Sequence, residues 1–349
     1  MELGILSLSD LQTSLDTGQP VSAVQRSDDI ISYGVLAEQL GLDLFALGEH
    51  HTLDFAVSSP AVVLAAIAAR TERIRLTSAV TVLSVLDPVR VYQDFAVLDL
   101  VSHGRAEIIA GRSAFTEPFA LFGAKLQEYD ALFSEKLDLL LKLRAQSRVT
   151  WTGRFRPPLD DAPIAPRAVQ QPLPVWVGVG GSPESAERAG RLGLPMVLGY
   201  IGGPLSSAQR AVDIYRMAGA RAGHAEQLRL GISTHFFAGA SPAAARSVFP
   251  YYQEYLRPKT PGGRGFIVNR AGFLAGTERG QALMIGSSAE LIEKILEAHR
   301  LLGVDRFFGQ VDWGGLPRPL VEESITRLAQ EIAPAVRAAT MAAEPATRP

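Results

Sequence analysis

The chain contains the segment Leu42-Asp43-Leu44-Phe45-Ala46-Leu47-Gly48-Glu49-His50-His51. Its apolar part predicts a buried strand, and the strand runs into a glycine, a carboxylate and two of the chain's six histidines. Parallel α/β folds place their reactive groups where a strand ends and a loop leads to a helix. The segment therefore predicts a strand of a parallel sheet with a functional site at its carboxyl end.

The same strand-then-helix unit recurs along the chain. Strands are predicted at 2–8, 43–47, 74–82, 105–110, 175–179, 194–200, 228–237 and 306–311. Helical spacing predicts helices at 24–40, 60–70, 88–103, 129–144, 183–192, 206–221, 242–256, 288–302 and 320–338. This alternation implies a parallel sheet with helices outside it, and eight such units closing on themselves make a TIM barrel. A doubly wound open sheet is the alternative.

Four segments fall outside this alternation. A small hairpin is predicted at 148–156, and 157–174 is a proline-rich insertion without a periodic pattern. Residues 257–280 are rich in glycine, proline and arginine and are expected to form a mobile loop. The barrel is expected to be a single domain over 1–338, with a frayed tail at 339–349.

The composition narrows the class of protein. The 349 residues include no cysteine and carry a net charge of −2, which excludes thiolate metal sites and gives no electrostatic case for binding nucleic acid. No apolar run is long enough to span a bilayer, and the N-terminus lacks the basic region of a signal peptide. We therefore expect a cytoplasmic protein without membrane or nucleic-acid partners.

The histidine pair has a functional and an ordinary interpretation. Histidine titrates near neutral pH, so His50 can act as an acid, a base or a hydrogen-bond donor, with Glu49 orienting the loop. Equally, the two histidines can be loop residues that merely fix the end of the strand. A metal site is not expected, because no third ligand follows at helical spacing.

A glycine-rich turn follows the strand at 175–179. Gly180 and Gly181 let backbone N–H groups approach an anion, and Ser182 and Ser185 open a helix whose dipole favours negative charge. Gly111 and Arg112 end another strand, and an arginine there can donate charge-assisted hydrogen bonds of about 1.5–3 kcal/mol each to a phosphate. The alternatives are a turn that needs glycine for its geometry alone and an arginine in a surface ion pair.

Aromatic side chains cluster near the predicted strand ends. Phe115, Phe119, Tyr200 and Trp313, together with Phe122 and Phe236, can line an apolar pocket. For any one of them, ordinary core packing is the competing interpretation.

Seven short segments follow one another along the chain: Gly48-Glu49-His50-His51, Asp87-Pro88-Val89-Arg90, Leu98-Asp99-Leu100-Val101-Ser102-His103-Gly104-Arg105, Gly111-Arg112, Phe122-Gly123, Gly180-Gly181-Ser182-Pro183-Glu184-Ser185 and Leu192-Gly193-Leu194-Pro195-Met196. As a set they resemble the bacterial-luciferase-like flavin monooxygenases. The resemblance covers roughly residues 2–204 and continues at 290–308.

The resemblance implies a TIM barrel that binds FMN at the carboxyl ends of its strands. It implies reduced FMN, supplied by a separate reductase, and O2 acting on a small, mostly apolar substrate. His50 is then the functional histidine, and a non-proline cis peptide is expected at Ala79-Val80. Cofactor contacts are expected from Ala79, Val80, Thr81, Gly111, Arg112, Gly180, Gly181, Ser182, Ser185 and Tyr200. Substrate contacts are expected from His51, Phe115, Phe119 and Trp313.

Two rival functions remain. Relatives of the same fold use a deazaflavin for hydride transfer, and its anionic tail would need basic residues such as Arg257 and Arg264. The other rival is a flavin-binding protein without turnover. The resemblance also implies a homodimer formed through barrel helices, for which the apolar helix at 60–69 is a candidate face.

Overall fold

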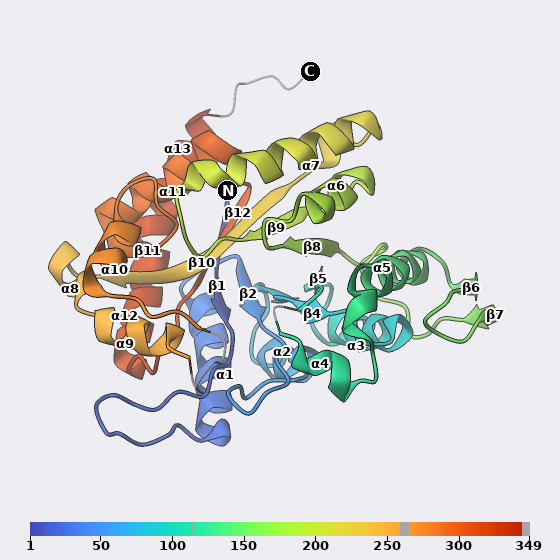
Figure 1. The fold of residues 1–349 in the computed structure, drawn as a ribbon, viewed down its shortest axis with the longest axis horizontal. Coiled ribbons are helices and arrows are strands. Elements are labelled where there is room, and N and C mark those ends of the chain that lie inside the picture. The colour runs from blue at the N-terminus through green and yellow to red at the C-terminus, as the bar shows by residue number, and fades with distance from the viewer. Residues whose placement is uncertain (114, 259–264, 344–349) are drawn as a thin grey trace.

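Eight parallel strands close into a barrel in this computed structural model, which describes residues 1–113, 115–258 and 265–343 (Figure 1). Around the barrel the order is β1 (Glu2–Ser7), β2 (Leu44–Leu47), β3 (Arg75–Ser78), β5 (Ala106–Gly111), β8 (Val175–Val179), β9 (Met196–Gly199), β10 (Leu230–Gly239) and β12 (Arg306–Gln310), which pairs again with β1. The predicted TIM barrel is thus confirmed.

Apolar side chains fill the middle of the barrel, and a charged layer closes its amino-terminal end. Leu6, Leu44, Ile109, Trp176 and Phe308 belong to the interior cluster. Below them the buried guanidinium of Arg306 lies 4.2 Å from the Trp176 ring centroid and donates to Glu107, with Nη1 at 2.6 Å from Oε2. This end of the barrel is therefore packed shut, so a functional site is expected at the other end of the strands.

The helices cover the outside of the barrel (Figure 1). They pack a continuous apolar core against the outward faces of the strands. The principal helices are α1 (Ala23–Gln39), α2 (Pro60–Ala68), α3 (Pro88–Val101), α4 (Glu117–Leu121), α5 (Tyr129–Ala145), α6 (Pro183–Arg191), α7 (Gln209–Arg221), α8 (Pro242–Arg246), α9 (Phe249–Leu256), α10 (Arg270–Thr277), α11 (Ser288–Leu302), α12 (Arg318–Arg327) and α13 (Ala333–Ala343). Residues that accept a hydrogen bond at a helix start, such as Asp87 and Ser182, fix where several of them begin.

Several segments differ from the prediction. The insertion at 157–174 contains β7 (Leu159–Pro163), which pairs with β6 (Arg148–Trp151), so the hairpin is longer than expected. The expected loop at 257–280 contains α10, whose start is capped by Asn269. A short strand, β11 (Met284–Ser287), was not predicted; it extends the sheet beside β10. The tail expected from 339 is helical to Ala343, because α13 continues past 338.

Two predicted elements are divided. The strand predicted at 74–82 is β3 followed by β4 (Thr81–Val82), with the irregular pair Ala79-Val80 between them. The helix predicted at 242–256 is divided into α8 and α9. Within the described residues, no helix is both long and apolar enough to cross a membrane.

Candidate active site

The floor of the barrel mouth is built from backbone. Gly111, Gly178, Gly180 and Gly199 stand at the carboxyl ends of β5, β8 and β9 and are called the glycine floor below. A Cβ on Gly180 or Gly199 would meet nothing within 4 Å, so both open onto free space. A planar group would have direct access to the main chain at Gly180 and Gly199.

The side chain of Val80 explains why two of these positions are glycine. A Cβ at Gly111 would lie 2.3 Å from Val80 Cγ2, and one at Gly178 would lie 2.7 Å from Val80 Cγ1. The Val80 side chain therefore occupies the space that side chains at both positions would need. The peptide bond before Val80 is cis, as the resemblance implied for Ala79-Val80. Ala79 and Val80 are half-buried and pack on the interior cluster, and Thr81 Oγ1 donates to Ser78 Oγ at 2.8 Å.

His50 lies in an aromatic box at the end of β2. Its ring is stacked on Phe55 with 3.8 Å between centroids, and Phe115 meets it edge-on at 5.4 Å. Burial, helped by the adjacent His51, lowers the pKa of His50 to about 4. Its Nδ1 is buried without a hydrogen-bond partner among the described residues. His50 is therefore a neutral imidazole held in place by packing.

Glu49 links His51 to the neighbouring strand β4 by hydrogen bonds. Its Oε1 lies 2.8 Å from His51 Nε2, and its Oε2 accepts from the Val82 backbone N–H at 3.1 Å. The His51 ring also packs edge-on against Phe122, 5.0 Å away. Glu49 thus orients His51 and the segment after the cis peptide, and makes no hydrogen bond to His50.

A cradle for an anion forms where β5 and β8 end, and the term anion cradle below means Arg112, Ser182, Ser185 and Arg188. Arg112 is bonded to Asp130 and lies 4.5 Å from the ring centroid of Tyr129. Ser182 caps α6, accepting from the Ser185 N–H at 3.4 Å, while the adjacent Gly181 has a φ of +95°. The hydroxyl of Ser185 is buried and has no partner among the described residues.

Arg188 is the member of the anion cradle that the sequence did not reveal. It stands one turn after Ser185 on α6, its guanidinium 5.4 Å from the Phe133 ring centroid. Its Nη1 is buried without a partner in the described part of the chain. Burial, followed by the charge of Arg112, lowers the pKa of Arg188. Two buried donors without acceptors and two neighbouring cations fit a phosphate group.

Next to Arg112, Ser113 adopts a φ of +85°, a value that favours glycine. Its hydroxyl donates to the Phe115 carbonyl at 2.9 Å. The turn that follows the arginine is therefore held by a serine side chain that also places Phe115 against His50.

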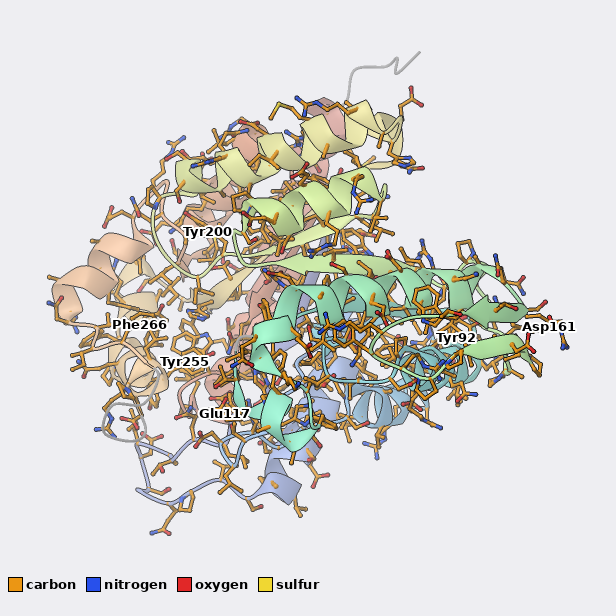
Figure 2. The ribbon with its side chains drawn as sticks, turned by 45° about the vertical axis from the view of Figure 1, so that its right-hand side comes forward. Tyr92, Glu117, Asp161, Tyr200, Tyr255 and Phe266 are labelled. Atoms are coloured by element: carbon orange, nitrogen blue, oxygen red, sulfur yellow. The ribbon has the colours of Figure 1, made fainter. Side chains whose placement is uncertain are left out.

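Two aromatic residues do not line a pocket as expected. Phe119 is buried with Val82, Val85 and Leu132, and Trp313 is fully buried with its Nε1 donating to the Phe236 carbonyl at 3.2 Å. A side chain without accessible surface cannot face a cavity, so we correct their role to packing behind the wall. Tyr200 is half-buried on the loop after β9, its hydroxyl 2.6 Å from Ser207 Oγ (Figure 2); its contact with a cofactor stays a prediction.

The described residues contain no group of three or more His, Cys, Asp or Glu side chains that could hold a metal ion. The candidate site thus combines the glycine floor, the neutral His50 and the anion cradle at the carboxyl ends of neighbouring strands. The sequence model of the family described as "Luciferase-like monooxygenase" matches residues 1–306. The chain belongs to this family.

Relatives in the family differ in cofactor. The chain is 34% identical over 154 residues, 44% of either protein, to the uncharacterized protein y4vJ of Sinorhizobium fredii. It is 32% identical to the F420-dependent glucose-6-phosphate dehydrogenase of Amycolatopsis mediterranei, over 51% of the chain and 56% of that enzyme. The matches thus span about half the length of these curated relatives.

Among solved structures, the fold resembles the oxygenating constituent of 3,6-diketocamphane monooxygenase from Pseudomonas putida, determined in complex with FMN. The TM-score is 0.75 at 19% identity, over 96% of this chain and 98% of that one. The family therefore includes both FMN-binding and F420-dependent members, joined by one fold.

Proposed function

We propose that the protein is an FMN-dependent monooxygenase that uses reduced FMN and O2 on a small, mostly apolar organic substrate. The observation that carries the proposal is the anion cradle, in which Ser185 Oγ and Arg188 Nη1 are buried donors without acceptors. An FMN phosphate would satisfy both, while Arg112 and the start of α6 would balance its charge. The isoalloxazine ring would lie on the glycine floor.

The charges around the anion cradle favour FMN over a deazaflavin with a long anionic tail. Glu184 on α6 and Asp130 on α5 are exposed beside it, and like charges there would repel such a tail. Of the two arginines proposed to bind that tail, Arg257 is paired with Glu254 at 3.0 Å, and Arg264 lies outside the described residues. The short phosphate of FMN avoids the acidic rim.

In this proposal bound reduced FMN supplies the electrons that activate O2. The chain's own residues position and shield the reaction. Neutral His50 presents a nitrogen that can hold or move one proton at the reacting centre. Its aromatic box excludes water from that proton, and Glu49 keeps His51 and the Val82 segment in place beside the floor.

The decisive experiment is an anaerobic titration with reduced FMN and with the reduced deazaflavin, followed by tryptophan fluorescence. Oxidised FMN and riboflavin serve as a second pair that differs only in the phosphate. We expect Arg112→Ala and Arg188→Leu each to weaken FMN about 10- to 100-fold, the loss of one charge-assisted contact, and to leave riboflavin unchanged. Arg191→Leu, on the exposed side of α6, is the matched control.

Equal affinity of the native protein for FMN and riboflavin would contradict the phosphate site. Tight binding of the deazaflavin alone would move the assignment to hydride transfer. Flavin binding without oxygen consumption under a broad substrate screen would favour a binding protein. We further propose that a separate reductase supplies the reduced FMN, so NADH alone should support no oxygen consumption until such a reductase is added.

We also propose that two copies of the chain associate through α2 and α3. These helices pack together and leave Val62, Val97, Leu100 and Val101 exposed. The three residues on α3 recur at helical spacing and form one apolar stripe. We expect Val97→Glu to convert a dimer into a monomer in light scattering, whereas Met217→Glu, at an exposed apolar position on α7, should leave the mass unchanged. A monomeric native protein would contradict this arrangement.

A further inference from the structure

Three charged side chains are buried together where β1 and β12 end. Asp10 follows β1, Asp312 follows β12, and Arg26 of α1 reaches between them. Arg26 Nη2 lies 3.2 Å from Asp10 Oδ1 and 2.9 Å from Asp312 Oδ2, and it donates to the Asp312 backbone carbonyl at 2.8 Å. Gly314 donates its backbone N–H to Asp10 Oδ2 at 3.3 Å. Asp10, Arg26 and Asp312 are called the charge latch below.

The carboxylates of the charge latch outnumber its cations. Asp10 is 3% exposed, Asp312 is 4% exposed, and among the described residues Arg26 is the only cation within ion-pair distance of either. Burying a carboxylate without a counter-charge is costly, and binding a proton removes that cost. Two buried carboxylates that share one guanidinium are therefore expected to hold one proton as a pair. In agreement, burial, opposed by Arg26 and reinforced by Asp10, raises the pKa of Asp312 to about 6.

The titratable groups around the charge latch do not supply a second positive charge. Tyr33 and Asp29 of α1 face Arg26, and Tyr255 of α9 faces both carboxylates. Burial raises the pKa of both tyrosines, so both stay neutral at neutral pH. Asp29 is paired with Arg318 of α12 at 3.1 Å, so these two charges largely cancel. The excess negative charge therefore stays with Asp10 and Asp312 unless they bind a proton.

The charge latch is connected to the loop that supports His50. Asp10 forms an isolated antiparallel bridge with Phe55. The next backbone N–H, that of Leu11, donates to the Asp54 carbonyl at 2.6 Å. Phe55 is the ring that stacks on His50 at 3.8 Å. A change at the charge latch can therefore reach His50 through the paired loops after β1 and β2.

Of the segments that meet at the charge latch, the loop after β1 is the one that can move. Its residues 15–20 are exposed, and it projects from the barrel in Figure 1. Asp312, in contrast, is followed by the fully buried Trp313. When both carboxylates are charged, opening this loop brings Asp10 to water. Because the pKa of Asp312 is raised, the stability that its proton contributes is complete in acid and is lost as the pH rises through about 6.

We propose that the charge latch is a proton-operated switch of the barrel mouth. With one proton shared between Asp10 and Asp312, the loops after β1 and β2 are closed, and Phe55 stays against His50. Without that proton, the loop after β1 opens and the support of Phe55 is lost. The inference goes beyond the proposed function, because it concerns how the mouth opens and needs no flavin.

The test is hydrogen–deuterium exchange of the full chain between pH 5 and pH 8, followed by mass spectrometry, with exchange times scaled to the intrinsic chemistry at each pH. We expect the protection of peptides covering 8–22 and 48–59 to fall as the pH rises. The fall is at most about 100-fold, the factor that corresponds to a pKa moved from about 4 to about 6. Peptides from α5 should keep their protection. Protection of 8–22 that does not change with pH would overturn the inference.

Two variants test whether the carboxylates share the proton. Asp312→Asn and Asp10→Asn each leave one carboxylate with Arg26, so each should keep 8–22 protected throughout the pH range. Asp28→Asn, which removes an exposed carboxylate of α1, is the matched control and should retain the native profile. His50 is present in all these proteins, so its own titration cancels in the comparison. A pH-dependent loss of protection that survives in either latch variant would refute the shared proton.

Discussion

His50 is uncharged in the folded protein at neutral pH. The stability of the fold therefore depends on the pH at which this histidine takes up a proton. Burial and the adjacent His51 lower its pKa to about 4, whereas the unfolded chain holds it near the ordinary value of about 6.5. Below pH ~6.5 the unfolded state takes up a proton that the native state refuses. The stability that His50 contributes is therefore complete above pH ~6.5 and is lost as the pH falls to about 4.

The expected size of this loss is about 3 kcal/mol, from the difference between the two pKa values. We predict that His50→Gln flattens the fall in melting temperature between pH 7 and pH 4.5 relative to the native protein. His224→Gln, which removes a histidine whose ring bonds to Gln227 on the surface, is the matched control. Parallel profiles for the native protein and His50→Gln would show that folding does not lower the pKa of His50.

At this scale the sequence predicted the residues with local signatures. His50, Arg112, Ser182 and Ser185 stand beside a strand end or a helix start, and the structure places them around the candidate site; their roles stay a prediction. Arg188 was not predicted, because its proximity to Arg112 arises only when α6 and the end of β5 come together. The available signal was its position one turn after Ser185 on the same helix. Trp313 was misjudged because a sequence does not show whether an aromatic ring faces a cavity or the core.

Val80, in the segment between β3 and β4, packs against both β5 and β8. We predict that Gly111→Ala destabilises the protein by about 1–3 kcal/mol, since its Cβ would overlap Val80 Cγ2. Val80→Ala in the same chain should recover only part of the loss, because it removes both γ-methyl groups but keeps the Cβ of residue 80, which would lie 2.7 Å from the new Cβ. Urea unfolding of the two single variants and the double variant measures this coupling.

Gly180→Ala is the control for crowding, since its Cβ meets no atom within 4 Å. Additive effects of Gly111→Ala and Val80→Ala would show that the glycine is required for a reason other than Val80. Such contacts between strands are invisible in sequence periodicity, which predicted the eight barrel strands yet missed β11. That strand has only four residues, too few to show a periodic pattern, and it is a strand because it pairs with the long β10.

The whole barrel depends on the charged layer at its closed end. Arg306, 2% exposed, bonds to Glu107 and to Glu2 Oε2 at 2.7 Å, and Arg75 adds a contact to Glu107 at 3.1 Å. We predict that Arg306→Met costs about 3 kcal/mol or more in unfolding free energy, because it leaves buried Glu107 with only a half-exposed partner.

Removing both charges should cost less than removing one. The variant Arg306→Met/Glu107→Leu leaves no buried ion without its partner, and Arg75 can turn to solvent. Urea unfolding curves of the single and double variants decide the point. A double variant less stable than Arg306→Met would mean that the ion pair stabilises the barrel beyond the cost of burying its charges.

The glycine floor has a consequence for how this molecule can diversify. At Gly180 and Gly199 its surface is main chain, so amino-acid exchange elsewhere in the sequence leaves the chemical character of that part of the platform unchanged. The loops after the barrel strands surround this base and are attached to the barrel at their ends. A library that varies these attachments would sample new specificities on a constant base. The barrel glycines would stay constant in such variants, while the loops around them change.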